Sequence, residues 1–265
     1  KGEFVRAGDV IAQCGNSGRS PYPHIHFQVQ SQPYIGARTT EYPFAYFTEK
    51  RQDSSESELQ QFSIPGEGSL LSNLQAGHLL HQAFNFLPDS SLCYSWTDNK
   101  GKSYTEHWDS YTDAYNYKYL YSRETGAVAY YTCDKLMFYF TGFYGSKKSL
   151  LYNFFLAASK VLLSNQPMPV TDTVALHLIP IPPVLRSLND FVAPFFNLLK
   201  VVYKQHALGS AITVDMQQLE LSSELTVSLF RKTIVHQHHQ LVIDAGGLKS
   251  FQIHTGRNTI YAEKI

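Results

Sequence analysis

Polar and aromatic side chains alternate with a period of two through the middle of this chain, and no other feature restricts the fold as strongly. Residues 92–97 and 103–108 flank a turn sequence at 98–101, and residues 115–122 and 127–134 flank a second turn at 123–126. Successive side chains of a strand point to opposite faces, so this alternation is typical of strands with one buried face. Two adjoining hairpins, continued by residues 135–144, predict an antiparallel meander.

One segment interrupts the alternation. Between residues 149 and 163, apolar side chains recur at intervals of three and four, which predicts a helix whose apolar face covers the sheet. The segment 184–196 is ambiguous between helix and loop, because Pro194 argues against a long helix there. Strand-like runs then return at residues 211–216, 224–231, 233–244 and 249–254.

Length and charge exclude several classes of partner. With 265 residues, 43% of them hydrophobic, the chain can bury a substantial core. Lys plus Arg and Asp plus Glu both total 22, so no net field attracts nucleic acid. The longest apolar runs, 136–144 and 150–163, fall short of the roughly 20 residues that cross a bilayer, so we expect no transmembrane segment. Because residue 1 is Lys and no leader opens the chain, we expect it to be part of a longer polypeptide.

The three cysteines are too few for a disulfide scaffold and are not spaced as a zinc knuckle. Cys93 and Cys133 lie in two predicted strands that could be neighbours, so one disulfide could form between them in an oxidising compartment. Small buried thiols are the interpretation that we favour.

Two histidines near the start of the chain are the strongest candidates for chemistry. His24 and His26 lie two residues apart, just before and within a predicted strand at 25–30, and follow a Gly-Asn-Ser-Gly turn at 15–18. Side chains at this spacing share one face of a strand, so both rings could address one metal ion. A zinc site needs about three protein ligands, and these two residues supply only part of one.

Separate motifs around this pair occur in the order found in one known family. They are residues 1–11, the turn at 15–18 and the Pro-His-Ile-His-Phe stretch at 23–27. Over about residues 1–47 the chain resembles the lysostaphin-type, or LytM-like, zinc metalloendopeptidases, which cut peptide cross-links in bacterial cell walls. The resemblance implies that His26 is a zinc ligand. It also implies that His24 orients or stabilises the attacking water and the developing oxyanion.

The same resemblance implies an incomplete site. The family's other ligands, in a His-x-x-x-Asp arrangement, and a further active-site His lie upstream of the part that matches, and they have no counterpart here. We therefore expect zinc and the hydrolysis of peptidoglycan peptides in a longer parent, and little activity from this chain alone. The implied location is the bacterial cell envelope, periplasmic or extracellular, with contact to the missing N-terminal region and an anchor outside this chain.

The predicted organisation is mainly β: a truncated antiparallel peptidase-like unit, then a β-rich meander or sandwich with at least one covering helix. We expect half of a peptidase domain over residues 1–48, a polar linker over 49–61 and an accessory domain of open role over 62–265. The alternative is a non-catalytic scaffold whose tyrosine-rich strands bind a partner or a glycan. Such a chain would be the soluble tail of a larger membrane-anchored protein, which could include a fused transporter.

Other polar clusters have ordinary explanations. His236, His238 and His239 are expected on an exposed strand edge. The pair His78 and His81 is expected on a helical turn with partly buried packing.

Three carboxylates raise a further alternative. Glu106, Asp109 and Asp113 near Trp108 suggest a sugar site or a carboxylate pair, although loops after strands often carry such residues. Their spacing cannot assign acid and base roles.

Overall fold

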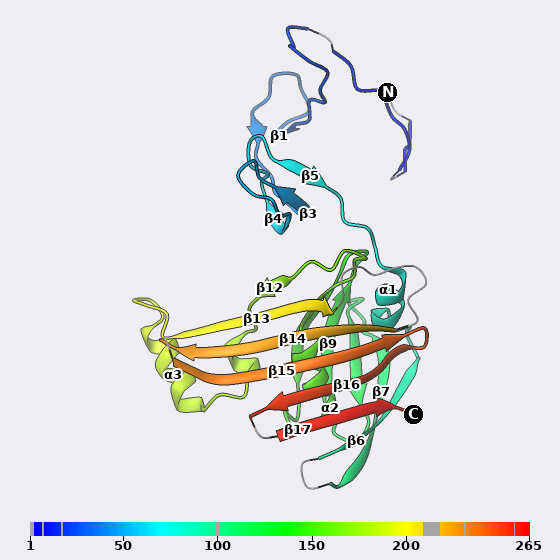
Figure 1. The fold of residues 1–265 in the computed structure, drawn as a ribbon, viewed down its shortest axis with the longest axis vertical. Helices are drawn as coiled ribbons and strands as arrows, with labels where there is room; N and C mark the ends of the chain where they lie inside the picture. The colour runs from blue at the N-terminus through cyan, green and yellow to red at the C-terminus, as the bar shows by residue number, and fades with distance from the viewer. Residues whose placement is uncertain are drawn as a thin grey trace.

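The computed structural model describes residues 3–6, 8–16, 18–98, 101–208, 218–230, 232–256 and 258–265. Most of the described strands form one large antiparallel sheet, and a smaller N-terminal part lies at one end of it (Figure 1). The predicted mainly β fold is confirmed. The strand predicted at 211–216 falls outside the described residues.

The large sheet contains twelve of the described strands, and it is a meander in which strands adjacent in sequence pair with each other. Its first strand, β6, pairs with its last, β17, so that Trp96 lies opposite Ala262. This pairing joins two segments that are far apart in the chain. The strands are β6 (Ser91–Thr97), β7 (Ser103–Thr112), β8 (Lys118–Ser122), β9 (Val128–Cys133), β10 (Met137–Tyr144), β11 (Lys160–Leu162), β12 (Val170–Asp172), β13 (Leu199–Leu208), β14 (Gln218–Leu229), β15 (Lys232–Asp244), β16 (Gly247–Thr255) and β17 (Asn258–Lys264).

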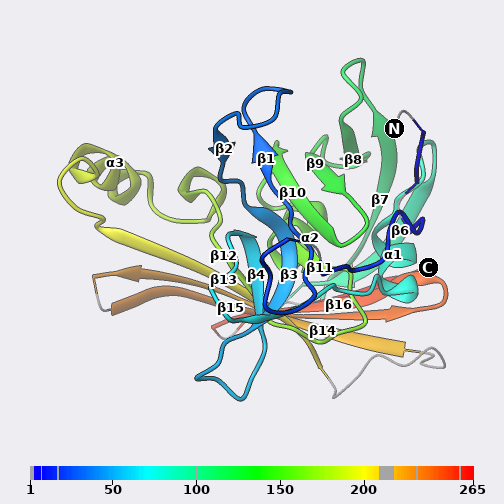
Figure 2. The same cartoon turned by 90° about the horizontal axis from the view of Figure 1, so that it is seen from above.

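The sheet curls into a nearly closed barrel whose seam lies between β11 and β12, the two ends of the strand order (Figures 1 and 2). Side chains bridge this seam. Lys160 Nζ on β11 donates to Asp172 Oδ2 on β12 at 2.6 Å. The backbone N–H of Leu162 lies 3.5 Å from Gln205 Oε1 on β13. Edge strands invite unwanted pairing, and two short edges held together in this way limit that risk.

Helix α2 (Leu150–Ala157) lies inside the barrel and packs against β9 and β10 from one half of the sheet and against β14, β15 and β16 from the other. All its residues except Asn153 are buried. The expected helix over 149–163 with one covering face is therefore corrected: the helix is shorter, residues 160–162 belong to β11, and the apolar surface runs around the whole helix. A helix that is apolar all round is stable only when it is surrounded.

Both ends of α2 are held by buried polar groups of the barrel. Glu106 on β7 accepts hydrogen bonds from the backbone N–H groups of Leu150 and Leu151, at 2.7 and 3.0 Å. At the other end, Tyr203 and Ser223 donate to the carbonyl of Ala157, at 3.0 and 2.7 Å. The first N–H groups and the last carbonyls of a helix lack partners within it, so these contacts fix α2 along its axis.

Aromatic rings fill the space between α2 and the barrel wall. Trp108 stacks on Phe154 with ring centroids 5.2 Å apart and lies 4.6 Å from Tyr94. Phe251 on β16 contacts Trp108, Phe154 and Tyr94. Rings from β6, β7, α2 and β16 thus join the two halves of the barrel through one core.

Of the two further helices, α1 (His78–Phe84) packs against β15 and β16 and adds to this core, since Phe84 is fully buried with its ring centroid 4.9 Å from that of Phe138 and 6.4 Å from that of Phe154. Helix α3 (Pro183–Val192) covers most of the ambiguous segment 184–196 and lies at one end of β13 to β15 (Figure 1). Asn189 of α3 accepts the backbone N–H of Leu199, whereas Leu188 and Phe191 on its outer side are exposed. A short 3-10 helix spans Leu176–Leu178.

The N-terminal part contains two small sheets. β1 (Val29–Gln30) pairs with β2 (Thr39–Thr40), and β3 (Phe44–Lys50) pairs with β4 (Glu58–Ser63) and β5 (Leu70–Ser72). The strand predicted at 25–30 is corrected to β1, because only residues 29 and 30 find a partner strand. The interval 49–61, expected as a linker, contains the end of β3, a loop and the start of β4.

The sheet of β3 and β4 contacts the barrel at its seam. Tyr46 and Leu59 pack against a small apolar cluster that includes Met137, Leu162 and Val170. Burial, with a contribution from the charge of Asp134, raises the pKa of Tyr46 to about 12. The two parts of the molecule therefore share a limited interface beside β11 and β12.

The disulfide considered between Cys93 and Cys133 does not form, and both thiols are free. Cys93 is on β6 and Cys133 on β9, with β7 and β8 between them in the sheet. The described helices include none that is both long and apolar enough to span a membrane.

Candidate functional site

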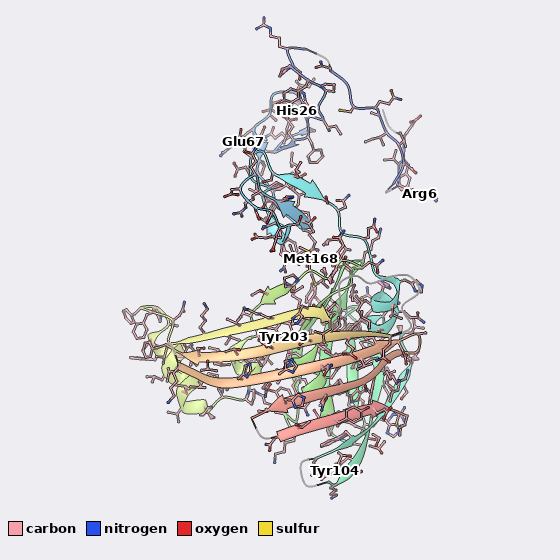
Figure 3. All side chains as sticks on the ribbon, viewed as in Figure 1. Arg6, His26, Glu67, Tyr104, Met168 and Tyr203 are labelled. Carbon is pink, nitrogen blue, oxygen red and sulfur yellow. The ribbon has the colours of Figure 1, made fainter. Side chains whose placement is uncertain are left out.

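His24 and His26 lie in an exposed stretch of irregular backbone that precedes β1 (Figure 3). The backbone N–H of His24 donates to the carbonyl of Gly15 at 3.3 Å. His24 Nδ1 lies 2.7 Å from Ser20 Oγ, and His26 Nε2 lies 2.8 Å from Gln28 Oε1. Each ring is held by its own neighbours in sequence, and the two rings share no hydrogen-bond partner.

This pair does not supply a complete zinc donor set. Within the part of the chain that the structure describes, no three His, Cys, Asp or Glu side chains gather where one metal ion could bind them. A catalytic zinc ion takes about three protein ligands and holds them at close to 2 Å, so two exposed imidazoles do not fit the group by themselves. Any metal chemistry at His24 and His26 needs donors from outside these residues.

Apolar side chains around the pair lack a core. Phe4, Val10, Ile25 and Ile35 are each at least 80% exposed, and Phe27 has its ring centroid 5.9 Å from that of Tyr42, its one ring contact among the described residues. Isolated apolar residues are common on protein surfaces, and this segment leaves most of its large apolar side chains exposed.

The histidines of β15 occupy a different environment from the one expected. β15 pairs with β14 and β16, so it is an interior strand of the sheet and not an edge. His236 is exposed, His238 is half-buried beside Ser222, and His239 is fully buried and points toward α2. The expectation of an exposed edge is therefore wrong, because β16 and β17 continue the sheet beyond β15.

His239 and Ser223 are residue types that occur together in catalytic pairs, but the hydrogen bond between them runs in the wrong direction for catalysis. Ser223 donates its only hydroxyl hydrogen to the Ala157 carbonyl, and His239 Nδ1 lies 3.0 Å from the same oxygen, so the histidine must donate to the serine. A general base would have to accept that proton instead. Burial, followed by the nearby charge of His238, lowers the pKa of His239 to about 3. This cluster holds the end of α2.

The three candidate carboxylates are also separated. Glu106 is buried against α2 and accepts a third hydrogen bond from Trp108 Nε1. Asp109 forms a bidentate pair with Arg123, and the hydrogen bond from Arg123 lowers the pKa of Asp109. Asp113 accepts the backbone N–H groups of Tyr115 and Tyr117 in the turn after β7. They do not form an acid and base pair.

A row of tyrosines crosses the outer face of the barrel. Tyr111, Tyr119, Tyr130 and Tyr144 come from β7, β8, β9 and β10, and successive ring centroids lie 5.7, 5.2 and 6.0 Å apart. The register of these strands sets Tyr111 opposite Tyr119 and Tyr119 opposite Tyr130. Tyr144 is 65% exposed, so this row meets solvent.

A hollow of about 720 Å³ opens at the β9 and β10 end of this row. We call it the tyrosine groove, and its residues include Asp113, Tyr117, Tyr130, Thr132, Gly142 and Tyr144. The pairing of β9 and β10 shifts register between Phe140 and Gly142. Such a bulge bends a strand, and the glycine beside it lets the Tyr144 ring lie close to the backbone, since a Cβ at Gly142 would be 3.6 Å from Tyr144 Cε2.

The groove is the feature that reading the sequence misses, although β10 carries a signal for it. Inward-facing Phe138 and Phe140 are two residues apart, but the next inward ring, Phe143, is three residues further on. A change from a spacing of two to a spacing of three indicates a bulge. Which tyrosines would meet beside it depends on strand register, which the sequence does not show.

Comparison of this chain with protein families, curated proteins and solved structures finds no match.

Proposed function

We propose that residues 3–47 supply His24 and His26 to a zinc metalloendopeptidase site that is completed by donors from outside this chain. The motifs between residues 1 and 47 support this proposal, as does the accessibility of both rings. In this assignment His26 binds the metal, and His24 lies beside the substrate. The proposed substrate is a peptide of the bacterial cell wall, which places the protein in the cell envelope.

The unpaired apolar residues of the same segment carry the proposal. Phe4, Val10 and Ile25 would lie against the missing half of the domain, which would bury them and bring the remaining metal ligands close to His26. Burying such side chains contributes about 1.5–3 kcal/mol each, so the two halves would associate strongly.

A longer polypeptide that carries the upstream half of the peptidase domain tests this proposal. We expect one bound zinc ion per protein, measured by metal analysis, and cleavage of purified muropeptides. His26→Ala should remove the metal, whereas His24→Ala should keep the metal and lose the cleavage. The variant His206→Ala, on the outside of β13, is the matched control. If the longer protein binds no zinc and cuts no muropeptide, the proposal is wrong.

A second candidate function follows from the barrel. The tyrosine groove supports a recognition role in which the N-terminal part acts only as a scaffold. Tyrosine is enriched at binding surfaces because its ring combines a large apolar area with a polar end. Sedimentation of the full chain with purified cell-wall sacculi tests this role. Binding should be unchanged in His26→Ala and weaker in Tyr130→Leu. The recognition role would be contradicted if neither variant weakened binding, or if both weakened it equally.

A further inference from the structure

We propose that the tyrosine groove binds the ammonium group of a lysine side chain within a peptide. The inference rests on the recognition role proposed for the barrel and is independent of the peptidase assignment.

The walls of the groove suit a cation. Tyr130 and Tyr144 stand almost perpendicular, with an interplanar angle of 87° and ring centroids 6.0 Å apart, and Tyr117 is 63% exposed beside them. Ring faces carry partial negative charge, so an ammonium group between several rings is attracted to each. Perpendicular rings surround such a group better than one flat stack does.

The charge of the groove has the matching sign. All residues that line it are described in the structure, and Asp113 is the only charged residue among them. The two backbone N–H bonds to Oδ1, both of 2.9 Å, fix its carboxylate, and Oδ2 accepts no hydrogen bond from the described residues. Asp113 and Tyr130 both line the groove, and burial, followed by the charge of Asp113, raises the pKa of Tyr130. A carboxylate among aromatic rings selects a cation over a neutral or anionic group.

The main chain of β10 indicates a peptide in preference to a free amine. Thr141 is exposed and has no register partner on β9. On its other side β10 pairs with β11 through residues 137–139, and the Phe140 N–H donates to the carbonyl of Ser159, so among the described residues the pairing of this edge ends before Thr141. Main-chain groups at an unpaired position of a sheet are available to an added extended peptide. The groove volume of about 720 Å³ is also much larger than one ammonium group requires.

The experiment uses the full chain with ¹³C-labelled tyrosine rings, titrated by NMR with two blocked tripeptides. The first has lysine at its centre, and the second has norleucine, which has nearly the same length without the charge. We expect the lysine peptide to shift the resonances of Tyr117, Tyr130 and Tyr144 and to bind at least about fivefold more tightly than the norleucine peptide.

Three variants locate the site. Asp113→Asn keeps Oδ1 as the acceptor for the turn and removes the charge, so it should weaken binding of the lysine peptide about fivefold. Tyr144→Leu removes an exposed wall of the groove and should weaken it about threefold. Tyr261→Leu changes a tyrosine of comparable exposure on β17, outside the groove, and should leave the affinity unchanged. Amide spectra of each variant confirm that the barrel is folded.

Several results would overturn the inference. Equal affinity for the two peptides would show that the groove does not recognise the ammonium group. It would leave the recognition role of the barrel intact. Unchanged binding in both Asp113→Asn and Tyr144→Leu would place the peptide elsewhere. If neither peptide shifts the groove tyrosines, the ligand assignment is wrong, and the sacculus sedimentation decides separately whether the barrel is a recognition module.

Discussion

The barrel buries its large apolar side chains, whereas the N-terminal segment leaves most of its own exposed. In the barrel, Trp108, Phe154 and Phe251 are almost completely buried around one helix. In the segment before β3, Phe4 and Ile25 are at least 80% exposed. Folding must offset a conformational entropy cost of roughly 1–2 kcal/mol per residue, and burial of apolar area is the main term that does so.

This difference separates a region that has its own core from one that does not. The barrel is nearly closed, with β6 paired to β17, and it contains its own core helix, so it has what an independently stable domain requires. The segment with His24 and His26 has two strands of two residues each and turns held by local hydrogen bonds. Chemistry that needs rigid positioning would require an additional surface there.

The largest expected effect is on the free energy of unfolding, and it compares a core residue of the barrel with an exposed residue of the N-terminal segment. Phe154→Ala should lower the free energy of unfolding by about 3–5 kcal/mol, because Phe154 is fully buried and contacts Trp108 and Phe251. Phe27→Ala, at a side chain that is 68% exposed, should change it by less than about 0.5 kcal/mol. Urea denaturation followed by far-UV circular dichroism measures both. Similar losses in the two variants would mean that the N-terminal segment is packed as tightly as the barrel.

The second expected effect is acid sensitivity of the barrel through His239. Its pKa is about 3 in the folded protein, well below the ordinary value of 6.5, so below pH 6.5 the unfolded chain binds a proton that the folded chain excludes. Stability is therefore lost as the pH falls from about 6.5 toward 3, by up to about 1.4 kcal/mol per pH unit. Denaturation at several pH values should show a shallower slope for His239→Asn than for the unchanged protein.

A histidine of the N-terminal segment is the control for the dependence of the unfolding free energy on pH. His24→Asn changes an exposed histidine of the N-terminal segment and should leave the difference between His239→Asn and the unchanged protein intact. Equal slopes for the unchanged protein and His239→Asn would show that the buried ring is not the group responsible.

Sequence patterns predict the strands of the barrel but not its closure. Alternation and turn residues locate β6 to β9 closely, because each hairpin is a local structure. The pairing of Trp96 with Ala262 joins residues more than 150 positions apart, and nothing in either segment specifies the other. The interior position of α2 follows from this closure, which explains why a helix expected to cover one face is buried on all sides.

The candidate sites show the same limit. His24 and His26 are identified by motifs, but β1 contains only the two residues that pair with β2, so both histidines lie outside the strand expected to hold them. The tyrosine groove combines Asp113 from a turn with Tyr130 and Tyr144 from different strands. Their approach depends on register and on one bulge, and both are set by tertiary pairing.

The third prediction concerns the cap on the core helix. Glu106→Gln preserves shape but replaces a carboxylate that accepts from Leu150, Leu151 and Trp108 with an amide whose NH₂ faces donors. We expect a loss of about 2–3 kcal/mol, because at least one buried donor is left without a partner. Urea denaturation gives this value, and near-UV circular dichroism reports the environment of Trp108. Glu41→Gln, at an exposed residue before β3, is the matched control and should have almost no effect.

The smallest expected effect is the removal of the N-terminal segment itself. A chain that lacks residues 1–42 retains Tyr46 and Leu59 against the seam of the barrel, and among the described residues that it loses, Ala37 is the only one that is buried. Its free energy of unfolding should therefore stay within about 1 kcal/mol of the full chain, and limited proteolysis of the full chain should cut first between residues 3 and 40. A large loss of stability on deletion would mean that the segment is packed on the barrel through contacts beyond those at the seam. In that case the exposed apolar residues around His24 and His26 would not need a covering surface from elsewhere, and the peptidase proposal would lose its main support.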